Sequence, residues 1–535
     1  MRHRRGLWPG LLCVAGLIIL EAGCGSGGSG GGGGSNTTPA PTVTLAASPT
    51  TVTSGQNATL TWSSTNATSC TASGSCSGSE ATSGSKTETP PATGTFTYTL
   101  ACTGTGGTAN ASATVTVTAQ RVITLSLVSS VPPIPNNIIY SDFGGIVTFT
   151  FNCTGCESGD ALTVESNGQT GTDPYVAGVS WAWQFNTTGL AYIPRIIKFF
   201  IKGVDGVVSN TFWYAFIGSQ NMAAEDSSSG EIYYAYPGNG TQGSFAVLKF
   251  KQDGTADGTF SDGGFGIAVD NLTHDVVFTH SGQISVDDSN GNQLTVVGIP
   301  NSSSNAYALD VSSADGLACA TQPTIDSASC LYLPTTISAP PVFSFPGLPS
   351  GSQPTAIKVL DATHVVLYGR GDRTLRWYTI SGTTATAAGT LVLSEFTAAD
   401  ASYWQQYPVT GGWDLVEVGS TLCVMGQVVN GDGTVSQKLE LVNNTNQTLT
   451  QYVALPTGTV HIAADPTNNA VVAEYIDFSG ASPIMRFERV YVGTGNTATL
   501  APTSTLVPGA GFLITLDGSH IAVFVEDEAD FEPNQ

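Results

Sequence analysis

Charged side chains are scarce in this chain of 535 residues, since Asp, Glu, Lys and Arg together make up 11% of it. Basic residues are the rarest of them: 17 lysines and arginines face 40 aspartates and glutamates, so the formal net charge is −23. Such an acidic surface repels nucleic acid and anionic lipid headgroups. The composition therefore excludes nucleic acid as a partner and excludes membrane attachment through basic side chains.

Strong helix formers are also in short supply. The chain contains 63 glycines and 27 prolines, with Ser, Thr, Val and Asn throughout, which leaves few candidates for long exposed helices. After residue 20 no hydrophobic run is long enough to span a bilayer. A chain of this length divides into several domains, each large enough to bury a core. We therefore expect an all-β protein of several domains.

The N-terminus has the features of an export signal. Arginines precede the apolar segment 7–20, whose length is typical of a secretory signal rather than a membrane span. Ala22, Gly23 and Cys24 resemble the end of a bacterial lipobox, in which the cysteine is acylated and becomes the mature N-terminus. This resemblance implies a signal peptide over 1–23, lipidation of Cys24, and contact with the membrane through acyl chains alone.

Two residues beside the lipobox bear on that interpretation. Glu21 departs from the pattern, which leaves open an ordinary signal peptide cut near the same place. Gly25 is not the aspartate that retains many lipoproteins in an inner membrane, so the resemblance favours the outer membrane or cell surface. Residues 24–40 are mostly glycine and serine and predict a flexible tether that holds the first domain roughly 20 Å from the bilayer.

The first folded domain is predicted at 41–118, where polar and apolar residues alternate as in half-buried strands. The segments SPTTVTSGQNATLTWSSTNATSCTASG and FTYTLACTGTGGTANASATVTV resemble a bacterial immunoglobulin-like repeat. The resemblance implies an Ig-like β-sandwich that serves as a spacer or adhesive module. Relatives commonly carry Trp where Cys76 stands.

Eight cysteines remain besides Cys13 and Cys24, which fits an oxidising compartment. Closeness in sequence or the family pattern suggests three disulfides: Cys70 with Cys102, Cys153 with Cys156, and Cys319 with Cys330. The CTGC spacing at 153–156 also matches a redox motif, but its flanks are strand-like, which favours a structural bridge or free thiols. Cys76 and Cys423 would then stay unpaired.

A second β-sandwich is predicted at 119–218, from six strand-like segments and a Pro-rich connection at 132–135. Its aromatic residues could stack on sugars as a carbohydrate platform, or could form the core of the sandwich; they are Trp181, Trp183, Phe199, Phe200, Trp213 and Tyr214. The core is the favoured interpretation, because aromatic rings in alternating strands are usually buried.

Residues 219–535 contain an internal repeat of roughly 40 to 56 residues, in which a strand, a polar turn and a second strand recur seven times. This pattern is typical of β-propeller blades. The segment GEIYYAYPGNGTQGSFAVLKFKQDGTADGTF resembles the Asp-Gly-rich propeller repeats of bacterial surface proteins. The prediction is a six- or seven-bladed propeller, and six is favoured, with the last two strands pairing with 231–251 to remove exposed edges.

Histidines recur in the polar turns of this repeat. His274, His364 and His520 follow Asp270, Asp361 and Asp517, respectively. A zinc site needs ligands that lie close together, whereas equivalent turns of different blades are spread around a ring, so polar turn residues are favoured over a metal site. His280 and His461 show no evident partner in the sequence.

Two further motifs are weak. Asp253 and Asp257, and then Asp287, Asp288 and Asn290, cluster oxygen ligands as calcium loops do, although ordinary turn chemistry is favoured. Residues 370–372 spell Arg-Gly-Asp, an adhesion tripeptide that short sequences match by chance. Arg370, Arg373 and Arg376 could equally form the outward face of propeller strands.

No paired nucleophile and base is evident in the sequence. We therefore expect a cell-envelope lipoprotein that displays a β-propeller to bind an envelope protein or a polysaccharide, without catalysis and with calcium as the one cofactor considered. Propellers also host enzymes, so a hydrolase or lyase acting on polysaccharide is the first alternative. A passive structural protein of the envelope is the second.

Overall fold

The structure is a computed structural model that describes most of the chain after residue 37. The described residues are 38–131, 134–140, 146–166, 169–186, 195–217, 223–236, 246–260, 264, 266–280, 282–300, 308–312, 316–322, 325–333, 341–393, 414–430, 434–480, 482–500, 514–515, 520–525 and 528–533. Within them the regular elements are β-strands and short 3-10 helices, and no helix is long and apolar enough to cross a membrane. The fold is therefore all-β, as the composition predicts.

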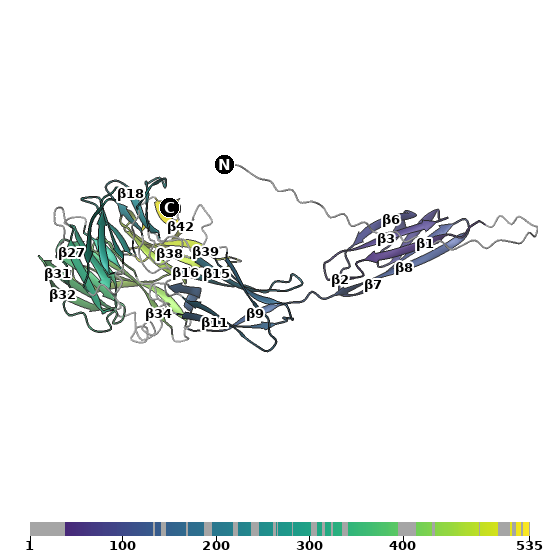
Figure 1. The fold of residues 1–535 in the computed structure, drawn as a ribbon, viewed down its shortest axis with the longest axis horizontal. Coiled ribbons are helices and arrows are strands. Elements are labelled where there is room, and N and C mark those ends of the chain that lie inside the picture. Colours follow the sequence, from purple (N-terminus) through teal and green to yellow (C-terminus); the bar gives the residue numbers. More distant parts are fainter. Residues whose placement is uncertain are drawn as a thin grey trace, which may run out of the picture. The chain divides into compact units, whose positions relative to one another are not determined.

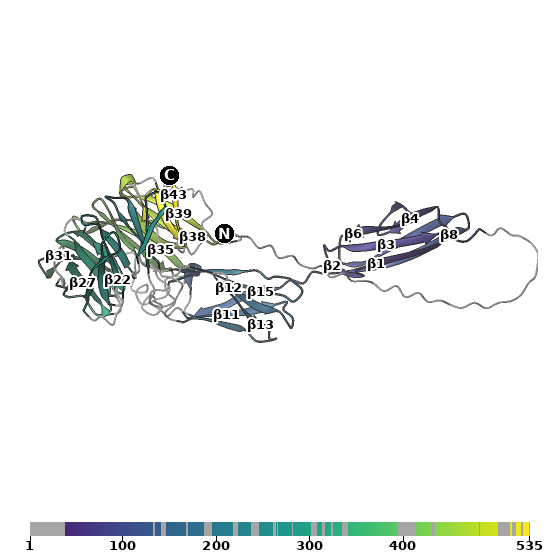
Figure 2. The ribbon, with the colours of Figure 1, turned by 45° about the horizontal axis from the view of Figure 1, so that its top comes forward.

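The chain divides into two compact units, Met1–Gln120 and Arg121–Gln535. The first unit is a sandwich of two sheets (Figure 2). One sheet has the order β1 (Thr42–Ser48), β3 (Ala58–Thr65) and β6 (Ser83–Glu88). The other has the order β2 (Thr51–Thr53), β8 (Gly107–Thr118), β7 (Gly94–Gly104), β4 (Ser69–Gly74) and β5 (Gly78–Glu80).

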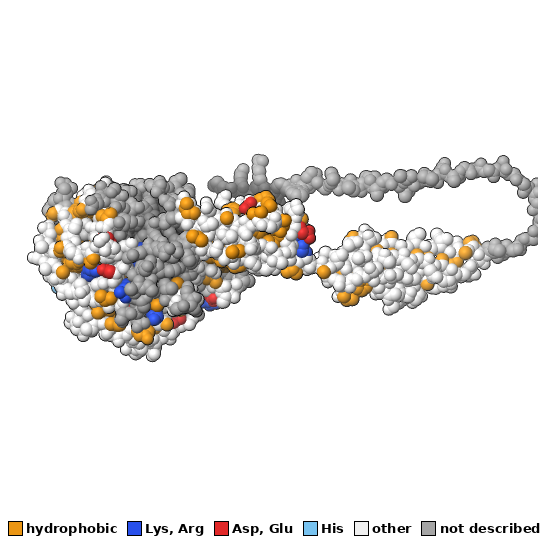
Figure 3. Space-filling view, turned by 90° about the horizontal axis from the view of Figure 1, so that it is seen from below, with side chains coloured by type: hydrophobic (Ala, Val, Ile, Leu, Met, Phe, Trp, Pro, Cys, Tyr) orange, Lys and Arg blue, Asp and Glu red, His pale blue; other side chains and the backbone are white. Residues whose placement is uncertain are grey.

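Alternation along the strands builds the core of this sandwich. In β3, Ala58, Leu60 and Trp62 are buried and the threonines between them are exposed, as the period of two along a strand requires. A disulfide joins Cys70 of β4 to Cys102 of β7, which face each other across the two strands. This sandwich contains very few charged side chains, and its visible face in Figure 3 is almost uncharged.

The second unit begins with another sandwich. Its larger sheet has the order β10 (Ile138–Tyr140), β16 (Phe212–Ile217), β15 (Arg195–Lys202), β12 (Ala161–Ser166) and β13 (Gln169–Pro174). Its smaller sheet has the order β14 (Trp181–Asn186), β11 (Ile146–Thr154) and β9 (Thr124–Val131), and η1 (Pro135–Asn137) precedes β10. Phe149 and Phe151 of β11 pack against Phe199 and Tyr214 of the facing sheet.

The remaining strands form seven small sheets, which we call ring sheets one to seven in chain order. Each of the first six has four antiparallel strands in sequence order, and the described part of the seventh has three. The strands are β17 (Ala223–Asp226), β18 (Glu231–Tyr236), β19 (Ala246–Phe250) and β20 (Ala256–Phe260); β21 (Gly266–Asp270), β22 (Asp275–His280), β23 (Gln283–Asp287) and β24 (Gln293–Gly298); β25 (Leu309–Val311), β26 (Leu317–Gln322), β27 (Ser327–Tyr332) and β28 (Phe343–Ser344); β29 (Pro354–Asp361), β30 (His364–Gly369), β31 (Thr374–Ser381) and β32 (Thr384–Val392); β33 (Asp414–Val418), β34 (Thr421–Val429), β35 (Val435–Asn443) and β36 (Thr448–Ala454); β37 (Thr459–Asp465), η4 (Pro466–Asn468), β38 (Ala470–Asp477), β39 (Ile484–Tyr491) and β40 (Thr497–Leu500); and β41 (Ile514–Thr515), β42 (His520–Val525) and β43 (Glu528–Pro533).

The first strands of these sheets form a closed circle. In order, β17, β21, β25, β29, β33, β37 and β41 each contact the next, and β41 also contacts β17. Figure 1 accordingly places β42 near β18, where the two ends of the ring meet. This arrangement is propeller-like, because each small sheet packs face to face on the next around a common centre.

The favoured prediction, six blades closed by pairing the last two strands with 231–251, was wrong. The described strands within 231–251, β18 and β19, pair with β17 and β20 rather than with the C-terminal strands. The physical reason is the tight turn 227–230, which returns the chain directly from β17 onto β18 and fills the inner position of that sheet. The C-terminal strands therefore form a sheet of their own between ring sheets six and one.

Apolar side chains between neighbouring ring sheets form the core of the ring. Met425 and Leu439 of ring sheet five, for example, pack with Ile462 and Val471 of ring sheet six. Because both faces of each sheet are covered, whole strands such as β26 are buried along their length. Cys319 and Cys330 form a disulfide inside ring sheet three, between β26 and β27.

The second sandwich packs on one end of the ring. Ile138 and Ala215 of the sandwich contact Val460 and Ile476 of ring sheet six. The Asn136 side chain donates a hydrogen bond of 3.3 Å to the carbonyl oxygen of Val435, where β35 begins. The sandwich thus meets ring sheets five and six at the end where the inner strands β33 and β37 start.

Candidate functional site

The predicted signal peptide and lipidation site cannot be located in the structure. Residues 1–37, including the signal peptide and Cys24, lie outside the described residues. The three predicted disulfides are those of the structure: Cys70 with Cys102, Cys153 with Cys156 and Cys319 with Cys330. Cys76 and Cys423 are free. Cys423 is buried in the core, and that burial raises the pKa of its thiol to about 12.

The weak calcium candidates lie in or beside two turns, where Asp253, Asp257 and Asp288 already have partners. Asp253 accepts hydrogen bonds from Thr255, and Asp257 lies 3.4 Å from the Lys251 ammonium. Asp288 accepts from the backbone N–H groups of Asn290 and Asn292, as in an ordinary Asx turn, and Asp287 is buried at the end of β23. Among the described residues no group of three His, Cys, Asp or Glu side chains could hold a metal ion.

The turn histidines are spread over the ring rather than gathered. His274 Nδ1 lies 2.6 Å from Asp226 of the preceding ring sheet, and His364 Nδ1 lies 2.9 Å from Asp361 of its own turn. Burial acts to raise the pKa of Asp226, but hydrogen bonds from Ser228 and His274 outweigh it and lower that pKa to about 2. The side chains of His280 and His520 lie outside the described residues.

The arginines at 370–376 do not form an outward face. Arg370 is buried and donates to Gln353 Oε1 over 3.0 Å, and Arg376 is also buried and pairs with Asp372. The Arg-Gly-Asp tripeptide is therefore not an exposed adhesion motif. In the second sandwich, Trp181, Phe199 and Tyr214 are in the core, which confirms the core interpretation for these rings.

A set of charged side chains that the sequence analysis missed lies on the inner strands of the ring. The Lys358 ammonium on β29 is 2.9 Å from Asp310 Oδ2 on β25, and the same carboxylate oxygen accepts the backbone N–H of Val359 over 2.7 Å. Both side chains stay partly exposed, Lys358 at 29% and Asp310 at 21%. The pair thus joins neighbouring ring sheets without being sealed from solvent.

Glu417 on β33 extends this set to a third ring sheet. Its Oε1 accepts a hydrogen bond of 3.1 Å from the Asn444 side-chain amide, whose own oxygen accepts from Trp377 Nε1 over 2.7 Å. Burial raises the pKa of Glu417 above its ordinary value, while the nearby Lys358 charge opposes that rise. An acid, a lysine and a second acid therefore follow one another around the inside of ring sheets three, four and five.

The same arrangement recurs two sheets further on. His461 on β37 has its Nδ1 3.4 Å from Asp414 Oδ2 on β33, and that oxygen accepts the backbone N–H of Ile462 over 2.8 Å. His461 therefore has the partner that the sequence did not reveal. Glu474 of β38 stands directly opposite His461 in the strand pairing, is 1% exposed, and has no hydrogen-bond partner for its Oε2.

Only one sequence feature could have indicated these pairs. In each case the basic residue lies about one repeat length after the acid, and the separation of Lys358 from Asp310 is 48 residues. Equivalent strands of consecutive repeats lie side by side in a propeller-like ring, so a search at the repeat spacing would have found both pairs.

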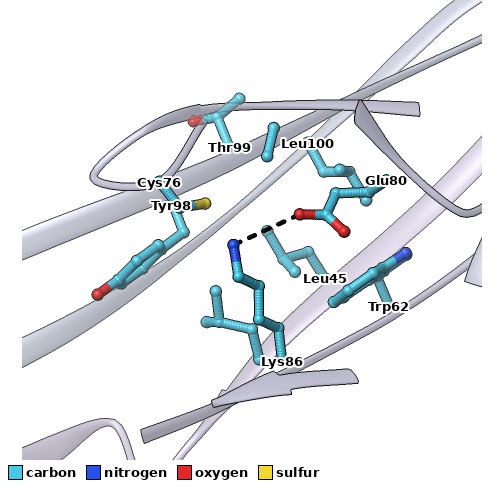
Figure 4. Close-up of a pocket in the computed structure, with 10 residues that line it drawn as sticks. Leu45, Trp62, Cys76, Glu80, Lys86, Tyr98, Thr99 and Leu100 are labelled. Atoms are coloured by element: carbon cyan, nitrogen blue, oxygen red, sulfur yellow. Dashed lines mark ion pairs between the residues drawn. The ribbon is translucent and has the colours of Figure 1, made fainter. Parts of the chain in front are cut away.

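The first sandwich contains a pocket that is a second candidate site. It lies between the two sheets and is lined by Leu45, Trp62, Tyr98, Lys86 and Cys76, as Figure 4 shows. Burial raises the pKa of the Cys76 thiol, and Glu88 adds to that rise. A thiol held protonated is a poor nucleophile, so this pocket is not a reactive cysteine site.

Comparisons with known proteins give a likeness of fold only. The sequence matches no protein-family model. It also matches no curated protein. Among solved structures, the chain is similar to hydrazine synthase of Kuenenia stuttgartiensis, at 10% identity over 58% of this chain and 94% of that chain, with a TM-score of 0.43.

The chain is also similar to two other solved structures, each with a slightly lower TM-score. A streptogramin B lyase has 12% identity over 59% of this chain and 92% of that chain, with a TM-score of 0.38. A dihydro-heme d1 dehydrogenase has 10% identity over 61% of this chain and 66% of that chain, with a TM-score of 0.38. Hydrazine synthase and the streptogramin B lyase are β-propeller-like proteins. At this level of similarity they indicate nothing about the activity of this chain.

Proposed function

We propose that this chain is an exported lipoprotein that displays a seven-bladed β-propeller to bind an envelope protein or a polysaccharide. Acylation of Cys24 anchors it in the outer membrane or at the cell surface, residues 24–40 serve as the tether, and two sandwiches, the first of them Ig-like, act as spacers. The lipobox and the signal segment support the anchor, and the closed circle of inner strands supports the propeller.

The observation that carries the binding role is the series Asp310, Lys358 and Glu417 on neighbouring inner strands. Ligand sites combine a concave surface with a few fixed polar groups. Lys358 is held by Asp310, and Glu417 is held by Asn444, so both side chains keep a fixed direction while staying partly exposed. Such groups can accept hydrogen bonds from hydroxyl or amino groups of a ligand and can donate one from the ammonium group.

The test is capture of a ligand by the full mature chain from solubilised envelope and from surrounding polysaccharide. We compare the native chain with the double variant Asp310→Asn, Glu417→Gln. The control is Glu165→Gln, which changes a carboxylate that pairs with a lysine, Lys198, on the second sandwich. We expect the double variant to bind at least about tenfold more weakly, because each lost charged contact costs a few kcal/mol.

Equal binding by the double variant and the native chain would refute this site. Absence of any saturable ligand would favour the passive structural role instead. The anchor is tested separately by metabolic labelling with a fatty acid, where Cys24→Ser should abolish the label and Cys76→Ser should leave it intact. Label that survives Cys24→Ser would refute lipidation at this residue.

A hydrolase or lyase acting on polysaccharide is the second candidate, and one observation favours it. Asp310 and Glu417 are two carboxylates on either side of Lys358; Asp310 pairs directly with that lysine, whereas burial raises the pKa of Glu417. Carboxylates with different environments can act as acid and base in glycan cleavage. Turnover on a panel of glycans, lost in both Asp310→Asn and Glu417→Gln, would support this candidate, and turnover that survives both changes would exclude these residues from it.

A further inference from the structure

An apolar cluster joins the second sandwich to ring sheet six. Its buried members are Ile138, Ala215, Val460 and Ile476, with Ile196 and Phe478 partly buried beside them. Val460 lies on β37 and Ile476 lies on β38, at the same end of ring sheet six. Any movement of these two strand ends therefore changes the surface on which the sandwich rests.

Ionisable side chains lie directly behind this surface. His461 is adjacent to Val460 in the chain, and Glu474 precedes Ile476 by two residues, which puts Glu474 and Ile476 on the same face of β38. Glu474 and His461 are cross-strand partners, so their side chains also share a face of ring sheet six. Asp414 reaches the pair from ring sheet five.

The surroundings of Glu474 disfavour its charged form. Among the described side chains, Glu474 faces His461 from β37 and Asp414 from β33, and its partner on β39 is Phe487, which carries no charge. The side chains of ring sheet seven lie outside the described residues. The described sandwich side chains at the contact carry no charge: Ile138 and Ala215 are apolar, and Asn136 is a neutral amide. Burial raises the pKa of Glu474 to about 8; Asp414 adds to that rise and His461 opposes it. When Glu474 ionises, its carboxylate therefore joins that of Asp414 beside the imidazole of His461.

A buried carboxylate gains free energy when water reaches an oxygen that has no hydrogen-bond partner, such as Oε2 of Glu474. Separation of the sandwich from ring sheet six is the movement that would admit water here, because the contact residues flank His461 and Glu474. We propose that Glu474, His461 and Asp414 form a proton-sensitive latch that holds the second sandwich on the ring and loosens as the medium turns from acid to alkaline. This inference does not depend on the proposed ligand.

Hydrogen exchange of the full mature chain measures how strongly the second sandwich is held on the ring. Protection factors, corrected for the intrinsic effect of pH, are compared from pH 5 to pH 9 for peptides that cover β10, β16, β37 and β38. We expect protection to fall by up to about tenfold per pH unit between pH 5 and pH 8 and then to level off. The first sandwich, which takes no part in the contact, supplies an internal reference.

Three variants separate the causes. Glu474→Gln cannot ionise and should show protection that is independent of pH, whereas Glu488→Gln on the neighbouring strand should keep the native response. Ile138→Ala should lower protection at every pH and leave its slope unchanged, because it weakens the apolar contact only. Native protection that does not change with pH, or a slope in Glu474→Gln equal to the native one, would overturn the proposal.

Discussion

Glu474→Gln should make the ring more stable at neutral pH, although it changes a buried residue. The unfolded chain gives this glutamate an ordinary pKa of about 4.3, and the folded chain raises it to about 8. The folded state therefore binds more protons than the unfolded state between these values. Stability contributed by the neutral acid is complete below about pH 4 and is lost as pH rises through 8.

The magnitude follows from linkage. Each pH unit between about 4.3 and 8 costs about 1.4 kcal/mol in the free energy of unfolding, so the loss at pH 7 is about 4 kcal/mol. Glutamine keeps the shape of the side chain and carries no charge at any pH. The variant should therefore match the native chain near pH 4, exceed it by about 1 kcal/mol at pH 5 and exceed it by about 4 kcal/mol at pH 7.

Urea denaturation at pH 5, 6, 7 and 8 measures this difference. Because the chain contains more than one cooperative unit, unfolding is followed by the exchange of peptides from β37 to β39, and the urea slope must be the same for both proteins. A gap that stays constant over this pH range would refute the reasoning, and so would a variant that is less stable than the native chain at pH 7. Either result would mean that Glu474 is charged and stabilised in the folded protein.

Three further predictions concern stability. Replacement of Cys319 and Cys330 by alanine should lower the free energy of unfolding by about 3 kcal/mol, because the disulfide closes a short loop in the unfolded chain; thermal denaturation measures it. Phe149→Ala should cost about 3 to 5 kcal/mol, since Phe149 is fully buried among aromatic rings of the second sandwich; urea denaturation measures it. Asp226→Asn should destabilise the ring above about pH 4, because the folded protein lowers the pKa of Asp226 to about 2. That difference should disappear as the pH falls from 4 to 1 in an acid titration followed by circular dichroism.

Controls separate these effects from general damage. Cys76→Ala removes a cysteine without removing a disulfide, so its melting temperature should stay close to the native value. Thr148→Ala changes the residue beside Phe149 and should cost far less than Phe149→Ala. An Asp226→Asn chain that stays weaker than the native chain even at pH 1 would contradict the electrostatic account, because the aspartate is then largely neutral in both states.

Local patterns in the sequence predicted many of the strands. The alternating segment 58–65 is β3, and the segment 95–102 lies within β7. Alternation marks a strand because successive side chains point to opposite faces, and this depends on nearest neighbours alone. Cys319 and Cys330 could be paired because they lie close together in the sequence.

Closure of the ring could not be obtained in this way. The repeat indicated seven hairpins, yet the favoured pairing of the last strands with 231–251 was wrong. Both closures remove exposed edges, and the hydrophobic pattern does not distinguish them. The choice depends on which strand packs beside β17 where the ring closes, and that is decided by the packing of the whole ring.

The candidate site shows the same limit. His461 showed no evident partner in the sequence, whereas Asp414 of the neighbouring ring sheet lies beside it in the structure. Glu474 gave no signal at all, because its position within an apolar strand says nothing about the charges that face it. The Arg370 tripeptide gave a misleading signal, since three residues cannot report their own burial.

The sequence by itself determined that this chain is built of strands, where many of them lie, which cysteines pair, and that its C-terminal part repeats. These properties follow from composition, from local alternation, from the internal repeat and, for the cysteines, from closeness in sequence or family resemblance. The tertiary structure decided how the ring closes, which acids meet Lys358 and His461, and how the second sandwich rests on ring sheet six. Those properties depend on groups about one repeat apart or further, which only the packing of the sheets brings within a few ångströms of each other.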